Sequence, residues 1–170
     1  MNKSVVSVIG WHNAGKTTFI VRLIEELKRR GLRVATIKHS REDLRLDTVG
    51  TDTWRYTQAG SDVVAISGKG CFALFEYPAE EPDLEAILAR VPDYVDLVIT
   101  EGFKRANTPK IEVVRSGIGE GPIASVGELL AIVTDKVSVH KGVPQFTPED
   151  VSGVVDLLFE REIIKKQGSQ

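Results

Sequence analysis

The sequence predicts an α/β fold of the P-loop NTPase type, with three layers, a mainly parallel sheet and a β-hairpin. Apolar, strand-like runs alternate with amphipathic helical segments along the 170 residues, which is typical of βαβ units. A glycine-rich loop at residues 10–17 joins the first predicted strand to the first predicted helix. Two later apolar runs flank a short glycine turn, which predicts some antiparallel pairing within or beside the main sheet.

The first elements surround the glycine-rich loop. Residues 5–9 (VVSVI) form a short β-branched run that suits a buried strand. Apolar side chains recur at helical spacing from Phe19 to Leu27, and Gly31 stands where this helix should end. Residues 33–38 (RVATIK) then predict the second strand.

A long polar segment follows the second strand. Residues 39–52 lack apolar periodicity, and a loop of this length is usually functional or mobile. Residues 54–59 predict a short helix that ends at Gly60. The hairpin comes next, with strands over residues 63–67 and 71–75.

The alternation continues in the second half of the chain. Pro82 suits the first turn of a helix, and the apolar face of that helix would carry Leu84, Ile87, Leu88 and Val91. Further strands are predicted over residues 96–100, 110–115 and 129–134. The segment between the last two strands, residues 116–125, is rich in glycine and is expected to be a loop.

The final helix is expected to begin at Thr147, in a capping-box arrangement with Asp150. Its buried stripe would consist of Val151, Val154, Val155, Leu158 and Phe159. We expect residues 1–165 to form a single nucleotide-binding domain and residues 166–170 to be a disordered tail.

Composition limits the classes of function. The net charge of −2 provides no basic field, so we expect no nucleic-acid partner. The sequence has no apolar stretch of membrane-spanning length and no secretory leader, so we expect a cytoplasmic protein without a membrane partner. Cys71 is the single cysteine, which excludes an internal disulfide, and its apolar surroundings predict a small buried side chain.

The segment GWHNAGKT at residues 10–17 fits the P-loop pattern G-x-x-x-x-G-K-[ST], which cradles nucleotide phosphates. Its glycines allow the backbone amides to surround an anion, and the following helix adds its positive end. Lys16 is expected to reach the β- and γ-phosphates and to act in catalysis, and Thr17 to ligate Mg²⁺. The predicted binding residues are Gly10, Trp11, His12, Asn13, Ala14, Gly15, Lys16, Thr17 and Thr18, with a solvated loop histidine as the alternative for His12.

A P-loop also needs a carboxylate at the end of a neighbouring strand. Glu101 follows four apolar strand residues, so we expect it to hold Mg²⁺ or its waters and to take part in catalysis. Gly102 would leave room for a γ-phosphate or a water. Asp96 enters the same strand at the wrong end. The alternative is that Glu101 is simply an exposed residue at a strand end.

The other candidate groups are weaker. In the loop after the second strand, Asp47 and Asp52 are candidates to complete the Mg²⁺ shell or orient a water, or merely to solvate the loop. Lys38 and His39 lie at the carboxyl end of the second strand, where ligands bind in open α/β sheets, although loop packing would also explain His39. Asp135 follows the last predicted strand and is either a guanine reader or a turn former.

Several segments together resemble the molybdopterin-guanine dinucleotide biosynthesis protein B (MobB) family. The resemblance covers most of the chain, and the segments that carry it are residues 10–17, 37–39 (IKH), 47–53 (DTVGTDT), 59–60, 101–104 (EGFK) and 110–111. It implies a P-loop protein that binds GTP with Mg²⁺, hydrolyses GTP slowly and forms a homodimer. It further implies an adapter in molybdenum cofactor biosynthesis, which assists the guanylyltransferase partner that attaches GMP to molybdopterin.

The resemblance also gives weight to particular residues. It implies functional roles for Lys38, His39, Asp47, Gly50, Asp52, Glu101, Gly102, Phe103 and Lys104. Lys38, Lys104 and Lys110 would be candidates for the phosphate of bound molybdopterin, or else ordinary solvated lysines. The chain departs from the family pattern where residues 40–43 lack a second histidine and where Thr51 replaces a lysine, so we expect no histidine-based contact there.

Two other enzyme classes and a purely structural module remain as alternatives. A small-molecule or nucleotide kinase would need an arginine-rich lid, for which Arg41, Arg45 and Arg55 are the nearby candidates. A nickel-insertion GTPase would expose clustered histidines or cysteines, whereas His12, His39, His140 and Cys71 are scattered in the sequence. No arginine finger is identifiable from the sequence, which predicts slow turnover.

Overall fold

The computed structural model describes residues 3–40, 44, 47–136 and 139–165, and it confirms the predicted α/β fold of the P-loop NTPase type. The chain divides into two compact units, one built from residues 1–39 and 88–170, the other from residues 40–87. The hairpin therefore lies in a different compact unit from the P-loop, and the single nucleotide-binding domain over residues 1–165 stays a prediction. Arg41, Arg45 and the predicted tail over residues 166–170 lie outside the described residues.

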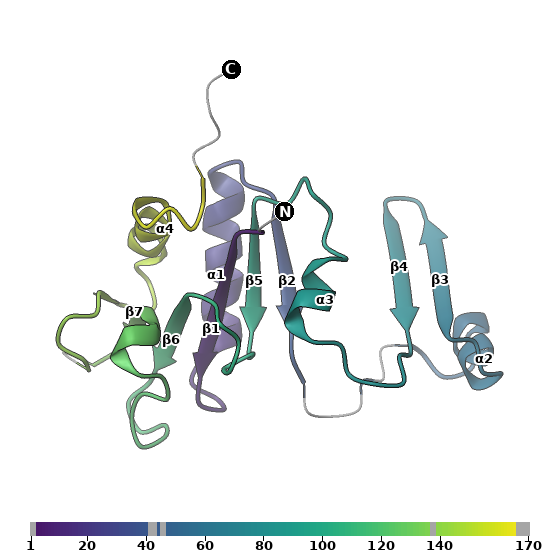
Figure 1. Cartoon of the computed structure of the whole chain (residues 1–170), viewed down its shortest axis with the longest axis horizontal. Coiled ribbons are helices and arrows are strands. Elements are labelled where there is room, and N and C mark those ends of the chain that lie inside the picture. Colours follow the sequence, from purple (N-terminus) through teal and green to yellow (C-terminus); the bar gives the residue numbers. More distant parts are fainter. Residues whose placement is uncertain (1–2, 41–43, 45–46, 137–138, 166–170) are drawn as a thin grey trace. The chain divides into compact units, whose positions relative to one another are not determined.

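A six-stranded sheet forms the centre of the larger unit (Figure 1). Its order is β2-β5-β1-β6-β7-β8, and every neighbouring pair is parallel. The strands are β1 (Val5–Gly10), β2 (Val34–Lys38), β5 (Leu97–Glu101), β6 (Lys110–Val114), β7 (Leu129–Thr134) and β8 (Gln145–Phe146). Because parallel strands end at the same edge, the carboxyl ends of β1, β5 and β6 lie next to one another.

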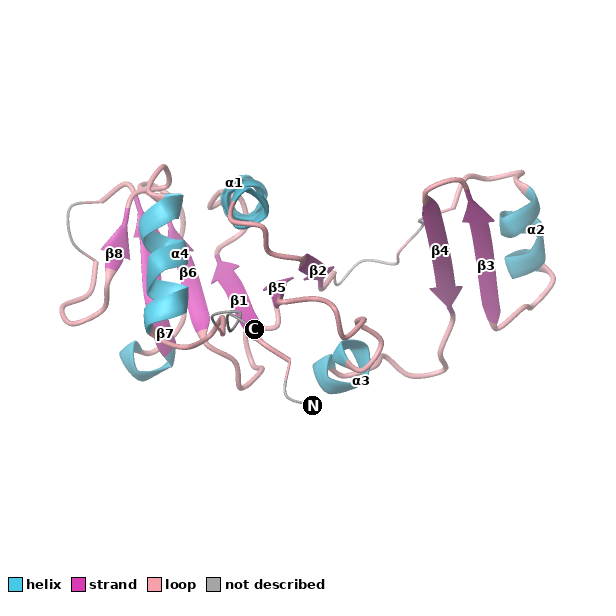
Figure 2. Cartoon of the chain, turned by 90° about the horizontal axis from the view of Figure 1, so that it is seen from above, coloured by secondary structure: helices cyan, strands magenta, loops and turns pink. Residues whose placement is uncertain are grey.

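The two long helices of this unit pack against each other and contribute to one core (Figure 2). Helix α1 (Lys16–Arg29) buries Phe19, Ile20, Leu23 and Leu27, which confirms the predicted stripe. Helix α4 (Val151–Glu160) buries Val151, Val154, Val155, Leu157 and Leu158, whereas Phe159 is only half-buried. These side chains meet the buried faces of β1, β5, β6 and β7.

The start of α4 differs from the prediction. Thr147 does not cap the helix; the N-cap is Asp150, whose carboxylate accepts a hydrogen bond of 3.0 Å from the Gly153 amide. Thr147 instead lies in a turn before the helix, where its carbonyl accepts from the Asp150 amide at 3.1 Å. An aspartate at the N-cap position satisfies one of the amides that a helix start leaves without a partner.

The second unit contains helix α2 (Asp52–Gln58) and a two-stranded antiparallel sheet of β3 (Val63–Gly68) and β4 (Cys71–Glu76). The predicted hairpin is thus present as a separate sheet. Cys71 is exposed rather than buried; the strand that it begins pairs with β3, and the main helix contact of this sheet is between α2 and β3. The α3 helix (Leu84–Leu88) is shorter than expected and ends before Val91. None of the helices in the described residues is both long enough and apolar enough to span a bilayer.

The capping of α4 can be tested by paired substitutions. Asp150→Ala should lower the free energy of unfolding by about 1 kcal/mol, because it removes the side-chain acceptor at the N-cap. Thr147→Ala, the matched control, should change it by less than about 0.5 kcal/mol. Urea unfolding followed by circular dichroism measures both values. A larger loss for Thr147→Ala than for Asp150→Ala would show that the helix is capped where the sequence analysis places it.

Candidate phosphate-binding site

The glycine-rich loop leaves β1 through a contact that only glycine permits. Gly10 has φ +148°, and a Cβ there would lie 2.4 Å from the carbonyl oxygen of Val113 on β6. A side chain at this position would therefore force the two strand ends apart. The loop then makes a tight turn, in which the Ala14 amide donates to the Trp11 carbonyl at 3.2 Å and Asn13 adopts φ +61°.

Helix α1 begins without a side-chain cap. Its N-cap residue, Gly15, provides no side-chain acceptor, and the first turn contains no acidic residue. The Phe19 amide makes the first helical bond, 3.0 Å to the Gly15 carbonyl. The preceding amides, those of Lys16, Thr17 and Thr18, consequently have no acceptor within the helix. An uncapped helix start with free amides and a positive dipole end is suited to an anion.

The Lys16 ammonium lies over this loop. Its Nζ donates to the Trp11 carbonyl at 2.8 Å and to the Gly10 carbonyl at 3.4 Å. Burial lowers the pKa of Lys16; Glu101 opposes this effect, and the positive charges of Lys104 and Lys38 add to it. Lys16, Lys38 and Lys104 come from separate segments and place positive charge around one part of the loop. Their mutual repulsion is unfavourable in the free protein and is relieved when a polyanion binds.

Glu101 meets the loop as the sequence predicts. The Thr17 hydroxyl donates to both carboxylate oxygens, at 3.3 Å to Oε1 and 3.2 Å to Oε2. A hydroxyl beside a carboxylate is a set of hard oxygen donors, the type that Mg²⁺ prefers, so these two residues fit the expected ion. Asp96 lies at the other end of β5, where it accepts a 2.7 Å hydrogen bond from the Arg33 amide.

The ends of β2 and β5 are tied together beside this pair. The His39 amide donates to the Glu101 carbonyl at 3.0 Å, and the His39 ring lies 5.0 Å from that of Phe103. A Cβ on Gly102 would lie 3.2 Å from the Cβ of His39. The missing side chain of Gly102 thus makes room for His39, where the sequence suggests a phosphate or a water. These contacts give His39 the packing role that the sequence leaves as its alternative.

Two of the predicted carboxylates belong to the second unit. Hydrogen bonds from Thr53, from the Thr48 amide and from Thr51 hold the pKa of Asp47 below its ordinary value. Asp52 starts helix α2, where its Oδ1 lies 4.0 Å from a guanidinium nitrogen of Arg55. Asp47 therefore organises the turn before the helix, and the roles of both aspartates toward Mg²⁺ stay predictions.

Asp135 follows β7 and holds a neighbouring loop. Its Oδ1 accepts from the Ser116 amide at 2.8 Å and from the Ser116 hydroxyl at 3.1 Å. These bonds, the amide bond above all, lower the pKa of Asp135. The carboxylate thus has a structural partner, in agreement with the turn-forming alternative, and its reading of guanine stays a prediction.

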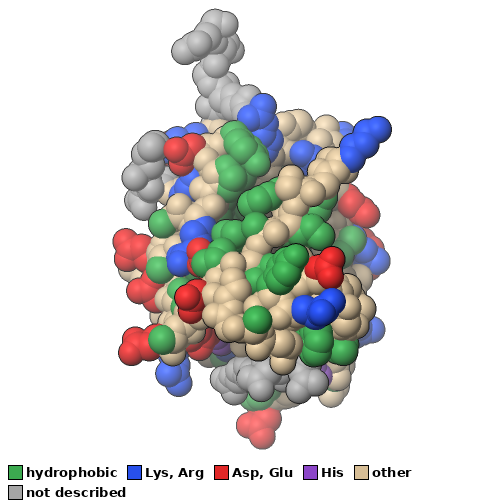
Figure 3. Space-filling view, turned by 90° about the vertical axis from the view of Figure 1, so that its right-hand side faces the viewer, with side chains coloured by type: hydrophobic (Ala, Val, Ile, Leu, Met, Phe, Trp, Pro, Cys, Tyr) green, Lys and Arg blue, Asp and Glu red, His purple; other side chains and the backbone are tan. Residues whose placement is uncertain are grey.

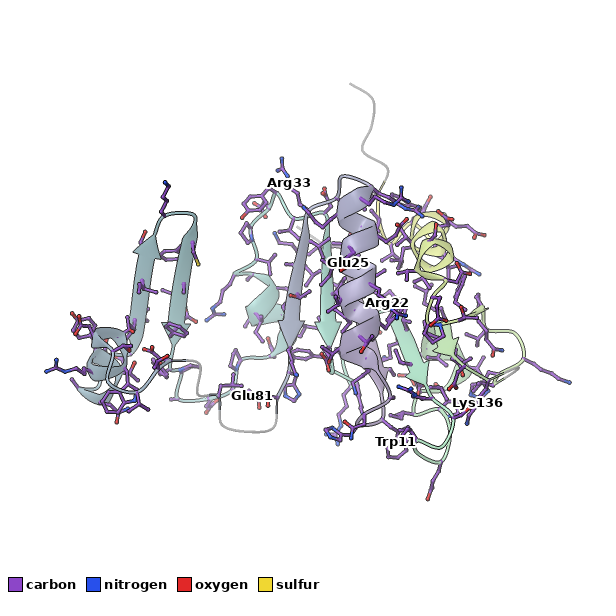
Figure 4. All side chains as sticks on the ribbon, turned by 180° about the vertical axis from the view of Figure 1, so that it is seen from behind. Trp11, Arg22, Glu25, Arg33, Glu81 and Lys136 are labelled. Atoms are coloured by element: carbon purple, nitrogen blue, oxygen red, sulfur yellow. The ribbon has the colours of Figure 1, made fainter. Side chains whose placement is uncertain are left out.

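One clamp on the glycine-rich loop has no clear signal in the sequence. Trp11 extends from the P-loop toward the 116–124 loop, and its Nε1 donates to the Gly121 carbonyl at 2.7 Å (Figure 4). Gly119, at φ +67°, lies so close that a Cβ would be 2.3 Å from the indole ring. The Lys104 ammonium lies 5.9 Å from the centroid of the same ring. Only the glycine content of the loop could have suggested that it receives a large side chain.

Two charged residues of β6 are buried, and for only one of them, Lys110, did the sequence suggest a role. Lys110 is buried and forms a 3.1 Å ion pair with Glu128. It is the first residue of β6 and so lies at the end of the strand away from the edge that carries the P-loop. It is therefore unsuitable for the pterin phosphate that the resemblance suggested. Glu112 is fully buried and accepts from the amides of Ile123 and Ala124 at 2.5 and 3.1 Å, which anchors the end of the 116–124 loop.

Comparison with known proteins gives one consistent result. The family model described as molybdopterin guanine dinucleotide synthesis protein B (MobB) matches residues 5–135. The molybdopterin-guanine dinucleotide biosynthesis adapter protein of Escherichia coli is 32% identical over 161 residues, covering 92% of this chain and 91% of that protein. A probable adapter protein of the same description from Bacillus subtilis is 32% identical over 152 residues, 86% of each chain. The crystal structure of Bacillus subtilis MobB superposes with a TM-score of 0.72 at 29% identity, covering 96% of this chain and 99% of that one.

The Trp11 clamp predicts different effects for two neighbouring glycines. Gly119→Ala should displace the indole, since the new Cβ would collide with it, whereas Gly117→Ala should not, since a Cβ there has nothing within 4 Å. Both glycines have positive φ, so the backbone strain of about 1 kcal/mol is common to both variants. In a Trp54→Phe background, Gly119→Ala should shift Trp11 emission to longer wavelength and increase acrylamide quenching. Equal spectra for the two variants would contradict the clamp.

Proposed function

Because this chain belongs to the molybdopterin guanine dinucleotide synthesis protein B family, we propose that it is a GTP-binding adapter in molybdenum cofactor biosynthesis. The observation that carries nucleotide binding is the uncapped start of α1. There, three amides without helical acceptors lie beside the Lys16 ammonium and the Thr17–Glu101 pair. Nearly every group that a triphosphate with Mg²⁺ requires is present at this one edge of the sheet.

The proposed binding mode follows from these contacts. The amides of residues 15–18 would hold the β-phosphate, and Lys16 would exchange its two carbonyl partners for β- and γ-phosphate oxygens. Thr17 and Glu101 would hold Mg²⁺, which neutralises charge on the phosphates. Burial lowers the pKa of Lys16 most, and the charges of Lys104 and Lys38 lower it further, so a polyanion relieves a repulsion that is already present in the free protein.

Hydrolysis of GTP, where it occurs, is expected to be slow. Lys16 would neutralise charge that develops on the γ-phosphate, and Glu101 would orient the attacking water. The space into which a Cβ on Gly102 would point is bordered by His39. A protein of this kind serves its pathway through binding and release of nucleotide more than through turnover.

The adapter role implies a second anionic ligand and a protein partner. Lys38 and Lys104 are exposed and act on Lys16 electrostatically, so they are suited to the phosphate of molybdopterin next to the nucleotide. Lys110 has no part in this proposal. The proposed partner is the guanylyltransferase that joins GMP to molybdopterin, and the Escherichia coli relative is named as an adapter protein in this biosynthesis.

A homodimer through the hairpin completes the proposal. Helix α2 covers one face of the hairpin, where Val64 is 4% exposed. The opposite face carries Val63, Phe72 and Leu74, which are 50%, 66% and 49% exposed. Figure 3 shows that hydrophobic side chains are exposed on one face of the molecule. A two-stranded sheet with uncovered apolar residues is marginal alone, so a second copy is its proposed cover.

Calorimetric titration tests nucleotide binding. The wild-type chain should bind GTP with Mg²⁺ and should prefer it to ATP, and Lys16→Ala should weaken binding at least about a hundredfold, because it removes a charged contact to two phosphates. Lys28→Ala, on the exposed far end of the same helix, is the matched control and should bind as the wild type does. Equal affinity for GTP and ATP would argue against a guanine-specific adapter.

Sedimentation equilibrium tests the dimer. Phe72→Glu with Leu74→Glu should raise the dissociation constant at least about tenfold, because two charges would have to be buried in the interface. Tyr94→Glu removes an equally exposed apolar side chain, 63% accessible, from the larger unit and should leave the dimer intact. Circular dichroism reports whether both variants are folded. A wild-type chain that remains monomeric at high concentration would end this part of the proposal.

A further inference from the structure

A guanidinium that no sequence motif signals lies beside the P-loop. Arg115 directly follows β6, and its Nη1 lies 3.9 Å from the position that a Cβ on Gly15 would occupy. Its side chain is exposed, and within the described residues no carboxylate forms a salt bridge with it. Asp135 feels its charge, yet the Oδ1 of Asp135 already accepts two hydrogen bonds from Ser116. Arg115 therefore has donors available next to the loop.

The sheet order defines which end of a nucleotide this guanidinium would meet. β5 and β6 lie on opposite sides of β1. The Thr17–Glu101 pair, which fits the metal, lies on the β5 side, and that ion bridges the β- and γ-phosphates in P-loop proteins. The γ-phosphate is thus directed toward β5. The opposite flank, which carries Arg115 and then Asp135, is left for the α-phosphate and the nucleoside.

The backbone of Arg115 is held firmly. Val114 before it is buried in the sheet, and Ser116 after it is bonded to Asp135. At the far end of the same loop, the buried Glu112 carboxylate fixes two amides. A guanidinium that extends from such a fixed point loses little entropy on binding and can present two parallel donors to one phosphate.

We propose that Arg115 donates to the non-bridging oxygens of the α- and β-phosphates, and so sets the affinity for nucleoside di- and triphosphates alike. This inference rests on the proposed binding of nucleotide at the P-loop. Arg115 therefore contributes to binding and not to the hydrolytic step, because the reacting γ-phosphate lies on the other flank. An arginine in trans or on a lid would act on the γ-phosphate, and would therefore distinguish GTP from GDP.

The experiment measures the affinity of GTP and GDP, each with Mg²⁺, by calorimetry. Arg115→Ala should weaken both about tenfold to a hundredfold and by equal factors, because it removes charge-assisted hydrogen bonds that both ligands share. Arg115→Lys should recover part of the loss, since it keeps the charge without the planar fork. Arg33→Ala removes the same charge from the opposite edge of the sheet and should change neither affinity (Figure 4). The rate of hydrolysis at saturating GTP should be unchanged in Arg33→Ala.

Each outcome decides the inference. Wild-type affinity in Arg115→Ala overturns it and leaves the proposed function intact, as does a loss confined to GTP. A wild-type chain that binds neither nucleotide refutes the proposed function and the inference together. Thermal melting reports whether Arg115→Ala is folded, and Arg115→Gln, which is polar and uncharged, carries the test if it is not.

Discussion

The close approach of β1 to β6 is the constraint on which the phosphate-binding edge depends. The carbonyl oxygen of Val113 occupies the space of a side chain at Gly10, so the chain can leave β1 only through a glycine. The loop then turns over the sheet edge and starts α1 with free amides at that point. The parallel sheet brings Glu101 to the same edge from one neighbouring strand and Arg115 from the other. The order of the strands thus places a negative and a positive side chain on opposite sides of the loop before any ligand is present.

The sequence was sufficient for the parts of this arrangement that are local. A β-branched run, the P-loop pattern and an amphipathic helix are consecutive in the chain, so local pattern alone predicts that Lys16 and Thr17 lie in the first turn of α1. Glu101 could also be predicted, because a carboxylate after a buried apolar strand must lie at the edge where the P-loop lies. The hairpin was predictable from its glycine turn, but its separation into a second unit was not.

The features that the sequence predicts wrongly, or does not predict, mostly depend on contacts between residues that are far apart in the chain. Cys71 has apolar neighbours in sequence, yet its strand belongs to a sheet with little to cover it. Lys110 and Glu112 look like ordinary strand residues with charges, and only the fold reveals that both are buried against the segment after β6. β8 has two residues, which is too short for any periodicity. The Trp11 clamp joins two loops about a hundred residues apart, for which local pattern carries no information.

The position of the second unit in the chain has a consequence for how the protein can change. Residues 40–87 enter after β2 and return before β5, and these two strands are neighbours in the sheet. The unit is thus an elaboration of a single crossover, and no hydrogen bond of the main sheet passes through it. Mutation can lengthen, reshape or replace this segment while the register of the six strands is preserved. The exposed face of the hairpin can therefore change without disturbing the edge that carries the P-loop.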